Sequence, residues 1–262
     1  INDEEIPHDT TILLVEDNPE ILDYVRRKLQ NTYRVITAVN GQEAFETAEK
    51  YMPDMVISDV MMPVMSGVEL CVKIKNTISL SHIPVILLTA KSLAMHIEEG
   101  FDAGADDYIV KPFSLSLLRV RIRNLLVGRQ RMQAVYYKRF SLENIGIKVE
   151  SLDDMFMNKY MEVVRKHIAE PDFGIDEICR EIGLSRANFY RKVKVITNLS
   201  PVEMIRNIRL ETAARLLKES GLSISEIAFK VGFNNHSYFT SCFKTLYGIS
   251  PTEYQEREKG EV

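Results

Sequence analysis

The sequence predicts an α/β domain with a doubly wound, five-stranded parallel sheet, followed by an all-α domain with two helix-turn-helix units. The chain has 262 residues, which suits two domains at roughly 100–200 residues each. In the first half, short apolar runs alternate with amphipathic stretches. In the second half, a pattern of residues occurs twice, which indicates an internal repeat.

Five apolar runs in the first half predict strands: Thr11–Val15, Tyr33–Ala38, Asp54–Ser58, Pro84–Leu88 and Asp106–Val110. Helices are expected between them, at 18–31, 40–50, 66–76 and 91–100, and another from residue 114. Strands that alternate with helices form a parallel sheet, and helices then cover both of its faces. Continuous apolar runs are typical of such doubly covered strands.

Each copy of the repeat reads as a helix, a glycine-containing turn and a second helix, which is the helix-turn-helix pattern. The first copy begins at Ile175 and the second at Ile224, with turn glycines Gly183 and Gly232. Between the copies, Pro201 to Glu219 predict a helix with proline in its first turn.

Composition excludes several classes of protein. No apolar run approaches the roughly 18–20 residues of a membrane span. The three cysteines are far apart, which argues against a disulfide framework or a zinc cluster. Residues 1–128 carry 12 Lys and Arg against 19 Asp and Glu, a balance of −7, whereas residues 129–262 carry 21 against 18, a balance of +3. Only the second half is thus compatible with binding to nucleic acid.

Polar residues gather where the predicted strands end. Glu16 and Asp17 follow the first strand, Asp59 the third, Thr89 the fourth and Lys111 the fifth. Ligands of such sheets bind at the carboxyl ends of the strands. Crowded carboxylates need a cation, and oxygen ligands suit Mg²⁺. A carboxylate beside a metal can attack phosphorus, while a lysine and the metal offset charge on the phosphoryl group.

Residues 9–128 resemble the receiver domain of bacterial response regulators. The resemblance rests on Leu14–Asn18, Ser58–Pro63 with Gly67, Leu88–Ala90 and Tyr108–Phe113, in the right order at strand ends. It implies a flavodoxin-like strand order, a cis Lys111–Pro112 peptide bond and Asp59 as the phosphoacceptor. It also implies that Mg²⁺ is bound by Glu16, Asp17, Asp59 and the carbonyl of Met61. Thr89 and Lys111 are expected to contact the phosphoryl group, and Thr89 and Tyr108 are expected to be the switch residues.

Two other functions are possible interpretations of this half. A phosphohydrolase with an aspartate nucleophile would need a second aspartate at position 61, where this chain has Met61. A docking module that works without phosphate would not need the complete acidic site. Each residue also has an ordinary structural use, for example as a helix cap, but such uses do not account for five matching strand ends.

Residues 129–152 are expected to form a linker. Leu118, Leu125 and Met132 recur every seven residues, and Ile122 and Tyr136 follow Leu118 and Met132 by four, so the last helix of the first domain could continue as a short coiled coil. The alternative, a plain connector, is favoured by Gly128, the charges and the short length.

Helical spacing sorts the second helix of each copy into two faces. Phe189, Val193 and Ile196 in the first copy, and Phe239, Phe243 and Leu246 in the second, are predicted to be buried. The outward faces are Ala187, Tyr190, Arg191 and Lys194, and Ser237, Thr240, Ser241 and Lys244. Six basic residues predict a surface that contacts phosphates: Arg186, Arg191, Lys192, Lys194, Arg206 and Arg209. The alternative is a helical bundle with solvated charges.

Residues 153–256 resemble the AraC-type DNA-binding domain, chiefly through the string from Ala228 to Tyr254. The resemblance implies DNA contacts from Arg186, Ala187, Tyr190, Arg191, Lys194, His236, Ser237, Thr240, Ser241 and Lys244. Ser241 stands where many members carry arginine, which weakens the case for base readout by the second copy.

The two resemblances together imply a transcription regulator controlled by phosphorylation, not an enzyme beyond phosphotransfer to Asp59 and its hydrolysis. The implied partners are Mg²⁺, a histidine kinase, promoter DNA and RNA polymerase, with a homodimer after phosphorylation. Because the first residue is Ile1, we expect a piece of a longer chain, similar to the end of hybrid two-component regulators that carry the kinase on the same chain. We expect it in the cytoplasm, with tethering to the inner membrane through preceding segments as an alternative.

Overall fold

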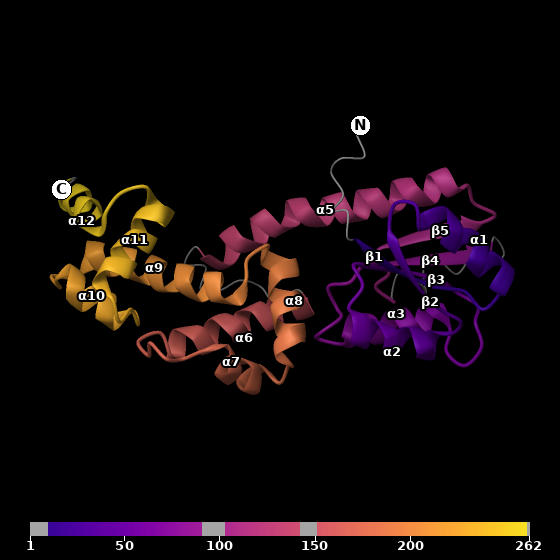
Figure 1. Cartoon of the computed structure of the whole chain (residues 1–262), viewed down its shortest axis with the longest axis horizontal. Helices are drawn as coiled ribbons and strands as arrows, with labels where there is room; N and C mark the ends of the chain where they lie inside the picture. The colour runs from indigo at the N-terminus through magenta and orange to yellow at the C-terminus, as the bar shows by residue number, and fades with distance from the viewer. Residues whose placement is uncertain (1–9, 91–102, 142–150, 261–262) are drawn as a thin grey trace. The chain divides into compact units, whose positions relative to one another are not determined.

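The computed structural model describes residues 10–90, 103–141 and 151–260, with only the backbone of 130–141 and 258–260 (Figure 1). The chain divides into two compact units, Ile1–Val135 and Tyr136–Val262, and each is described by itself. The predicted helix at 91–100 lies outside the described residues. Within them, no helix is both long and apolar enough to cross a membrane.

The first unit is built on the predicted five-stranded parallel sheet, with strand order β2-β1-β3-β4-β5. The strands are β1 (Thr11–Val15), β2 (Arg34–Ala38), β3 (Met55–Asp59), β4 (Val85–Ala90) and β5 (Asp107–Lys111). Four of them start one residue later than predicted, and β3, β4 and β5 also extend further, so that Asp59 and Lys111 are the last residues of their strands.

Helices cover both faces of the sheet, as a parallel arrangement requires. They are α1 (Pro19–Leu29), α2 (Gly41–Tyr51), α3 (Gly67–Asn76) and α5 (Leu115–Ser141). Alternation along β1 separates two cores. Ile12 and Leu14 pack with residues of α1 and α5, whereas Leu13 and Val15 pack with residues of α2 and α3.

Helix α5 differs from the plain connector favoured by the sequence, because it continues without a break past Gly128 to Ser141. Its first turns belong to the first unit, where Leu118, Ile122 and Leu126 are buried against the sheet. The spacing of Leu118 and Ile122 is therefore explained by packing on the sheet.

The second unit consists of helices α6 (Leu152–Lys166), α7 (Ile175–Ile182), α8 (Arg186–Thr197), α9 (Pro201–Glu219), α10 (Ile224–Lys230), α11 (His236–Tyr247) and α12 (Pro251–Gly260). The bounds of α9 are those predicted. Both turn glycines adopt the left-handed conformation, with φ +79° at Gly183 and +81° at Gly232, which favours glycine. Serines cap α9 and α10 in reciprocal contacts with Glu203 and Glu226.

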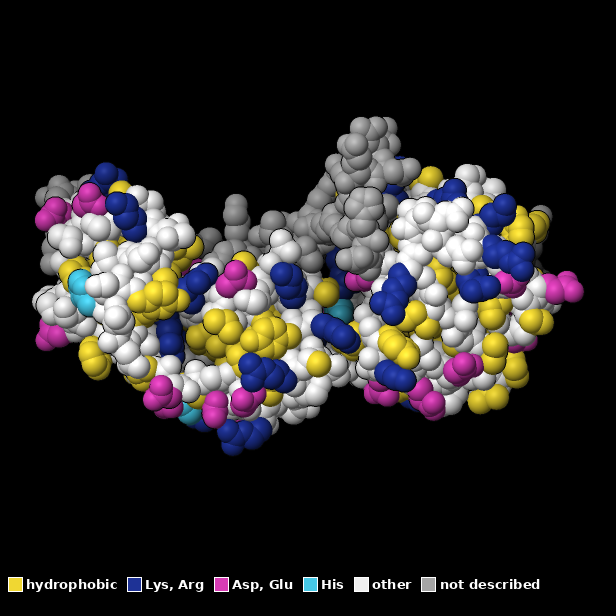
Figure 2. Space-filling view, viewed as in Figure 1, with side chains coloured by type: hydrophobic (Ala, Val, Ile, Leu, Met, Phe, Trp, Pro, Cys, Tyr) yellow, Lys and Arg dark blue, Asp and Glu magenta, His cyan; other side chains and the backbone are white. Residues whose placement is uncertain are grey.

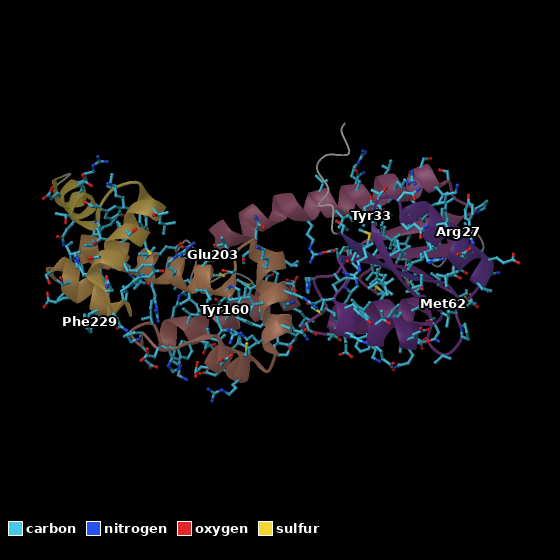
Figure 3. The ribbon with its side chains drawn as sticks, in the orientation of Figure 1. Arg27, Tyr33, Met62, Tyr160, Glu203 and Phe229 are labelled. Atoms are coloured by element: carbon cyan, nitrogen blue, oxygen red, sulfur yellow. The ribbon has the colours of Figure 1, made fainter. Side chains whose placement is uncertain are left out.

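The second unit has two separate apolar cores. Helices α6, α7 and α8 enclose the first core with the start of α9, where Met204, Ile205 and Ile208 lie. Tyr160 lies in this core (Figure 3), and its hydroxyl donates to the carbonyl of Pro201. Helices α10 and α11 enclose the second core with the later part of α9, from Leu210 onward. The single helix α9 thus serves both helix-turn-helix units.

The predicted buried faces of the second helices are mostly confirmed. Phe189, Val193, Ile196, Phe239 and Phe243 are all buried. The prediction for Leu246 is wrong, because this side chain is 39% exposed. Two tyrosines fill the place beside Phe243 instead: the ring of Tyr247 lies 4.5 Å and that of Tyr254 lies 5.4 Å from the ring of Phe243.

Candidate functional site

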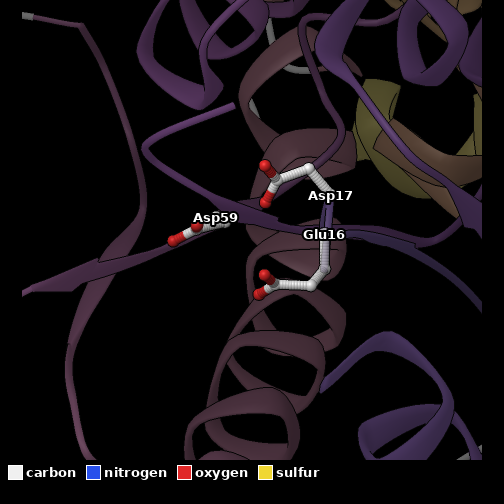
Figure 4. A group of neighbouring side chains, drawn as sticks. All are labelled: Glu16, Asp17 and Asp59. Atoms are coloured by element: carbon white, nitrogen blue, oxygen red, sulfur yellow. The ribbon is translucent and has the colours of Figure 1, made fainter. Parts of the chain in front are cut away.

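Three carboxylates meet at one edge of the sheet in the first unit. Glu16 and Asp17 directly follow β1, and Asp59 ends the neighbouring strand β3. Their ligand oxygens all lie within 4.8 Å of one another, and Figure 4 shows the three carboxyl groups pointing to the same side. Glu16 is buried and Asp17 is exposed, so the cluster is open to solvent on one side. The structure therefore brings together the three acidic residues named from the sequence.

Lys111 joins two of these carboxylates. Its Nζ lies 2.8 Å from Oε2 of Glu16 and 3.0 Å from Oδ1 of Asp59. Burial raises the pKa of Glu16, and the hydrogen bond from Lys111 offsets part of that rise. Burial alone would lower the pKa of Lys111, but its hydrogen bonds to Glu16 and Asp59 outweigh this and raise it. The salt bridge is thus favoured over the neutral pair at neutral pH.

One ammonium does not balance three carboxylates. The ionised cluster keeps an excess of negative charge at a solvent-accessible edge, where the donors are all oxygens. Such a donor set fits Mg²⁺, which takes one or two carboxylates and keeps several waters. The remaining expected protein ligand, Met61, lies in the loop after β3 and is 64% exposed, and its role would rest on the main-chain carbonyl.

A close approach of the chain shapes the loop beside Asp59. The amide of Gly67 donates to the carbonyl of Val60, so the loop from β3 returns to the end of the same strand. A Cβ at residue 67 would lie 2.0 Å from the carbonyl oxygen of Asp59, a distance that side chains do not tolerate. Glycine is therefore needed here to keep the loop and Asp59 in their positions.

Thr89 lies near the same end of the sheet, whereas Tyr108 lies nearer the start of β5, where it pairs with Leu87. Thr89 is buried on β4 and pairs in register with Val110, directly before the pair Ala90 and Lys111. Tyr108 is half-buried on β5 and packs against the core on the α2 and α3 side of the sheet. Burial raises the pKa of its phenol to about 12, so it is a neutral, partly apolar side chain at physiological pH.

The second unit presents most of the predicted DNA-contacting residues to solvent. On α8, Arg186, Ala187, Arg191 and Lys194 are exposed and Tyr190 is half-buried. On α11, His236, Ser237, Ser241 and Lys244 are exposed. Thr240 differs, because it is half-buried and its hydroxyl oxygen is enclosed, with no hydrogen-bond partner among the described residues. The Thr240 hydroxyl therefore does not face solvent in this structure.

The predicted six-residue basic surface is smaller than expected. Lys192 is fully buried, with its Nζ bonded to Asp153 and 5.1 Å above the ring of Phe156. Arg209 uses its guanidinium on two backbone carbonyls, and Arg186 pairs with Asp176 at 2.9 Å. Figure 2 agrees for the face that it shows, where lysines and arginines are scattered among other side chains and form no continuous patch. Of the six, Arg191 and Lys194 are exposed on α8 and Arg206 is half-buried on α9.

The burial of Lys192 had a signal in the sequence. Phe189, Lys192 and Ile196 are spaced by three and four residues, so they share one face of a helix. The opposite charge comes from Asp153, at the start of a helix that the sequence analysis did not predict. Without that helix, a lysine among basic neighbours was assigned to the surface.

Two family models match the chain. Residues 12–123 match the response regulator receiver domain, and residues 178–257 match a helix-turn-helix domain. The matches cover the sheet with its acidic edge in the first unit and both helix-turn-helix units in the second.

Curated relatives and solved structures are similar to the whole or to parts of this chain. Histidine kinase P4 of Formosa agariphila is 38% identical over 95% of this chain, which spans only 18% of that protein. Response regulator ArlR of Staphylococcus aureus is 35% identical over 53% of this chain and 63% of its own length. The signal receiver domain of a histidine kinase from Syntrophus aciditrophicus is 32% identical, with 54% of this chain and 98% of that chain covered and a TM-score of 0.44. The C-terminal domain of AraT, a response regulator from Geobacillus stearothermophilus, is 28% identical, with coverage of 39% and 84% and a TM-score of 0.37.

The fold and the family models define a receiver domain joined to a helix-turn-helix domain of the AraC type. The chain thus carries a response regulator receiver domain at residues 12–123 and a helix-turn-helix domain at residues 178–257, and it is similar to parts of longer histidine kinases and response regulators.

Proposed function

We propose that this chain is a phosphorylation-controlled transcription regulator in which Asp59 accepts a phosphoryl group from a histidine kinase. The observation that carries the proposal is the position of Asp59, with Glu16 and Asp17 close by and Lys111 3.0 Å from its Oδ1. In the reaction, a carboxylate oxygen of Asp59 attacks phosphorus of the phosphohistidine. The P–N bond breaks, a P–O bond forms, and the electron pair and a proton remain with the imidazole.

The neighbouring residues have separate tasks in this reaction. Glu16, Asp17, Asp59 and the carbonyl of Met61 hold Mg²⁺, which offsets the negative charge of the phosphoryl group when bound. Lys111 already touches Asp59 and needs only to turn its ammonium toward a phosphoryl oxygen. Thr89, close by on β4, donates its hydroxyl to another. Hydrolysis of the acyl phosphate ends the signal.

The switch is expected to act through Thr89 and Tyr108. Among the described residues, the hydroxyl of Thr89 makes one long contact, 3.4 Å, to the carbonyl of Ala90, and little is lost when this contact breaks and the hydroxyl moves to the phosphoryl group. Tyr108 then packs further inward from its half-buried position and changes the surface around β5. We propose that this surface forms a homodimer after phosphorylation.

The second unit binds promoter DNA through α8 and α11. At 1.5 Å per residue, the 19 residues of α9 span about 28 Å, near the roughly 34 Å between successive major grooves. We propose that α8 reads bases through Arg191, while Lys194 contacts phosphate. DNA-bound dimers then act on RNA polymerase. The kinase belongs to the same longer chain, as the similarity to Histidine kinase P4 suggests.

The proposal is tested by labelling the chain with a small phosphodonor such as acetyl phosphate. The wild-type chain is expected to incorporate an acid-stable, base-labile phosphoryl group, and Asp59→Asn or chelation of Mg²⁺ is expected to abolish it. Asp23→Asn serves as the control, because Asp23 is an exposed carboxylate that pairs with arginines on α1. Undiminished labelling of Asp59→Asn would contradict the proposal.

A further inference from the structure

The boundary between the two cores of the second unit falls at one residue of α9. Ile208 belongs to the first core and Leu210 to the second, and Arg209 lies between them. A single helix shared by two cores can bend or twist, and nothing in the cores themselves prevents this. The angle between the two helix-turn-helix units therefore depends on contacts at this boundary.

Arg209 makes such a contact in both directions. Its Nη2 donates to the carbonyl of Glu170 at 2.7 Å, in the segment between α6 and α7 of the first helix-turn-helix unit. Its Nη1 donates to the carbonyl of Gly232 at 3.1 Å, in the turn between α10 and α11 of the second. A planar guanidinium holds two acceptors in a fixed geometry, and a lysine ammonium does not.

The backbones of the two helix-turn-helix units also approach each other closely beside Arg209. A Cβ at Gly232 would lie 2.4 Å from the carbonyl oxygen of Ile168 and 2.9 Å from Cζ of Arg209. Gly183 is the counterpart of Gly232 in the first copy and has nearly the same φ, yet a Cβ there would meet nothing within 4 Å. A side chain at Gly232 is thus excluded by the close approach of the first helix-turn-helix unit as well as by the left-handed backbone of its own turn.

We infer that Arg209 is a positioning residue that fixes the separation and orientation of the recognition helices α8 and α11. This inference rests on the proposed function, since it concerns how one chain fits two half-sites at once. Two helices enter successive major grooves only at one half-site spacing. With the contact intact, the chain requires that spacing; without it, bending at α9 admits neighbouring spacings.

The contact borders an open cleft of about 350 Å³ between the two helix-turn-helix units, and its lining includes Phe173, Arg206, Arg209 and Tyr238. Its lining comes from α9, from residues 171–175 before and at the start of α7, and from residues 232–238 before and at the start of α11. The cleft therefore lies beside the boundary that Arg209 spans.

The test measures spacing preference in the full chain. A bipartite duplex is first selected from a randomised DNA library by the wild-type chain, and derivatives gain or lose one or two base pairs between the half-sites. The wild-type chain is expected to lose about tenfold or more in affinity for a wrong spacing, comparable to one mismatched base pair. Arg209→Met is expected to bind all spacings within about threefold of one another, with half-site preference unchanged.

Matched variants separate positioning from loss of stability. Gly232→Ala is expected to relax the spacing preference and Gly183→Ala to retain it, because both have the same backbone strain and only Gly232 approaches the other unit. Arg209→Lys is expected to restore the preference only in part. Arg215→Met, an exposed change on the same helix, is expected to behave as wild type.

If Arg209→Met lowers affinity for every spacing by the same factor, Arg209 only stabilises the fold and the inference is wrong. If the wild-type chain selects only a single half-site, the proposed use of both recognition helices is wrong as well.

Discussion

Removing Lys111 tests the electrostatics of the acidic edge in the metal-free chain. In Lys111→Met, Glu16 and Asp59 lose an ammonium at 2.8 and 3.0 Å. Unit charges at about 4 Å interact by about 4 kcal/mol at an effective dielectric constant of 20, and solvent on the open side reduces this. Protonation of Glu16 limits the loss further, because protonating a carboxyl with its ordinary pKa of 4.5 at pH 7 costs about 3.4 kcal/mol. We expect the receiver to lose about 2–3 kcal/mol at pH 7.

The loss is expected to depend on pH in a defined direction. Burial already raises the pKa of Glu16, and loss of the Lys111 hydrogen bond raises it further. A carboxyl with a raised pKa in the folded state destabilises the fold above that pKa, and the penalty is relieved as the pH falls toward 4.5. The difference between Lys111→Met and wild type should therefore shrink by up to about 1.4 kcal/mol per pH unit between pH 7 and pH 5.

Hydrogen exchange of the β1 and β5 amides measures this difference in the full chain, because it reports the first unit separately from the second. The experiment is done with a chelator at several pH values and repeated with Mg²⁺, which should recover part of the loss. Lys50→Met is the control, since Lys50 lies at an exposed position on α2, 4.9 Å over the ring of Tyr51. Equal losses at pH 5 and pH 7, or no loss in chelator, would refute this account of the site.

Three further predictions concern the dimer and the DNA-binding unit. Beryllofluoride with Mg²⁺ should convert the chain to a dimer in sedimentation, and an unchanged sedimentation coefficient would exclude phosphate-linked dimerisation. Arg191→Ala should reduce the free energy of DNA binding by about 1–3 kcal/mol and relax the preference at one base pair. Lys194→Ala should lower the affinity for all DNA sequences alike and reduce the salt dependence of binding by about one ion, whereas Ser241→Ala should change the affinity much less. Binding to a randomised DNA library at fixed salt measures these differences. Lys192→Met should destabilise the second unit by about 2–4 kcal/mol, because it removes the buried ammonium that pairs with Asp153. Adding Asp153→Asn should recover part of the loss in urea unfolding, and an additive loss would argue against the pair.

The sequence predicts those features that follow from the periodicity of apolar residues and from the residues at the ends of strands. Alternating apolar runs and helices located the sheet, and the strand ends brought Glu16, Asp17 and Asp59 into one cluster. The repeat placed both helix-turn-helix units, and helical spacing identified Phe189 and Phe243 as buried. These features follow from local rules that a single sequence carries.

What could not be predicted depends on distant partners. Lys192 is buried because Asp153 reaches it from α6, and Leu246 is exposed because Tyr247 and Tyr254 occupy the core instead. The role of Arg209 requires the carbonyls of Glu170 and Gly232, which belong to the two different helix-turn-helix units and are not related by any spacing in the sequence. In each case the spacing within a helix predicts which face a side chain lies on, but the residues that contact this side chain come from a different part of the fold.

The central claim is that phosphorylation at Asp59 controls DNA binding, and the most direct measurement is the affinity of the full chain for its selected duplex with and without beryllofluoride. A change of the dominant state from 1:99 to 99:1 corresponds to about 5.5 kcal/mol, so even a partial shift should raise affinity by about tenfold or more in the wild-type chain. Asp59→Asn should show no response to beryllofluoride. Equal affinity of the wild-type chain in both conditions, or an undiminished response in Asp59→Asn, would contradict the account.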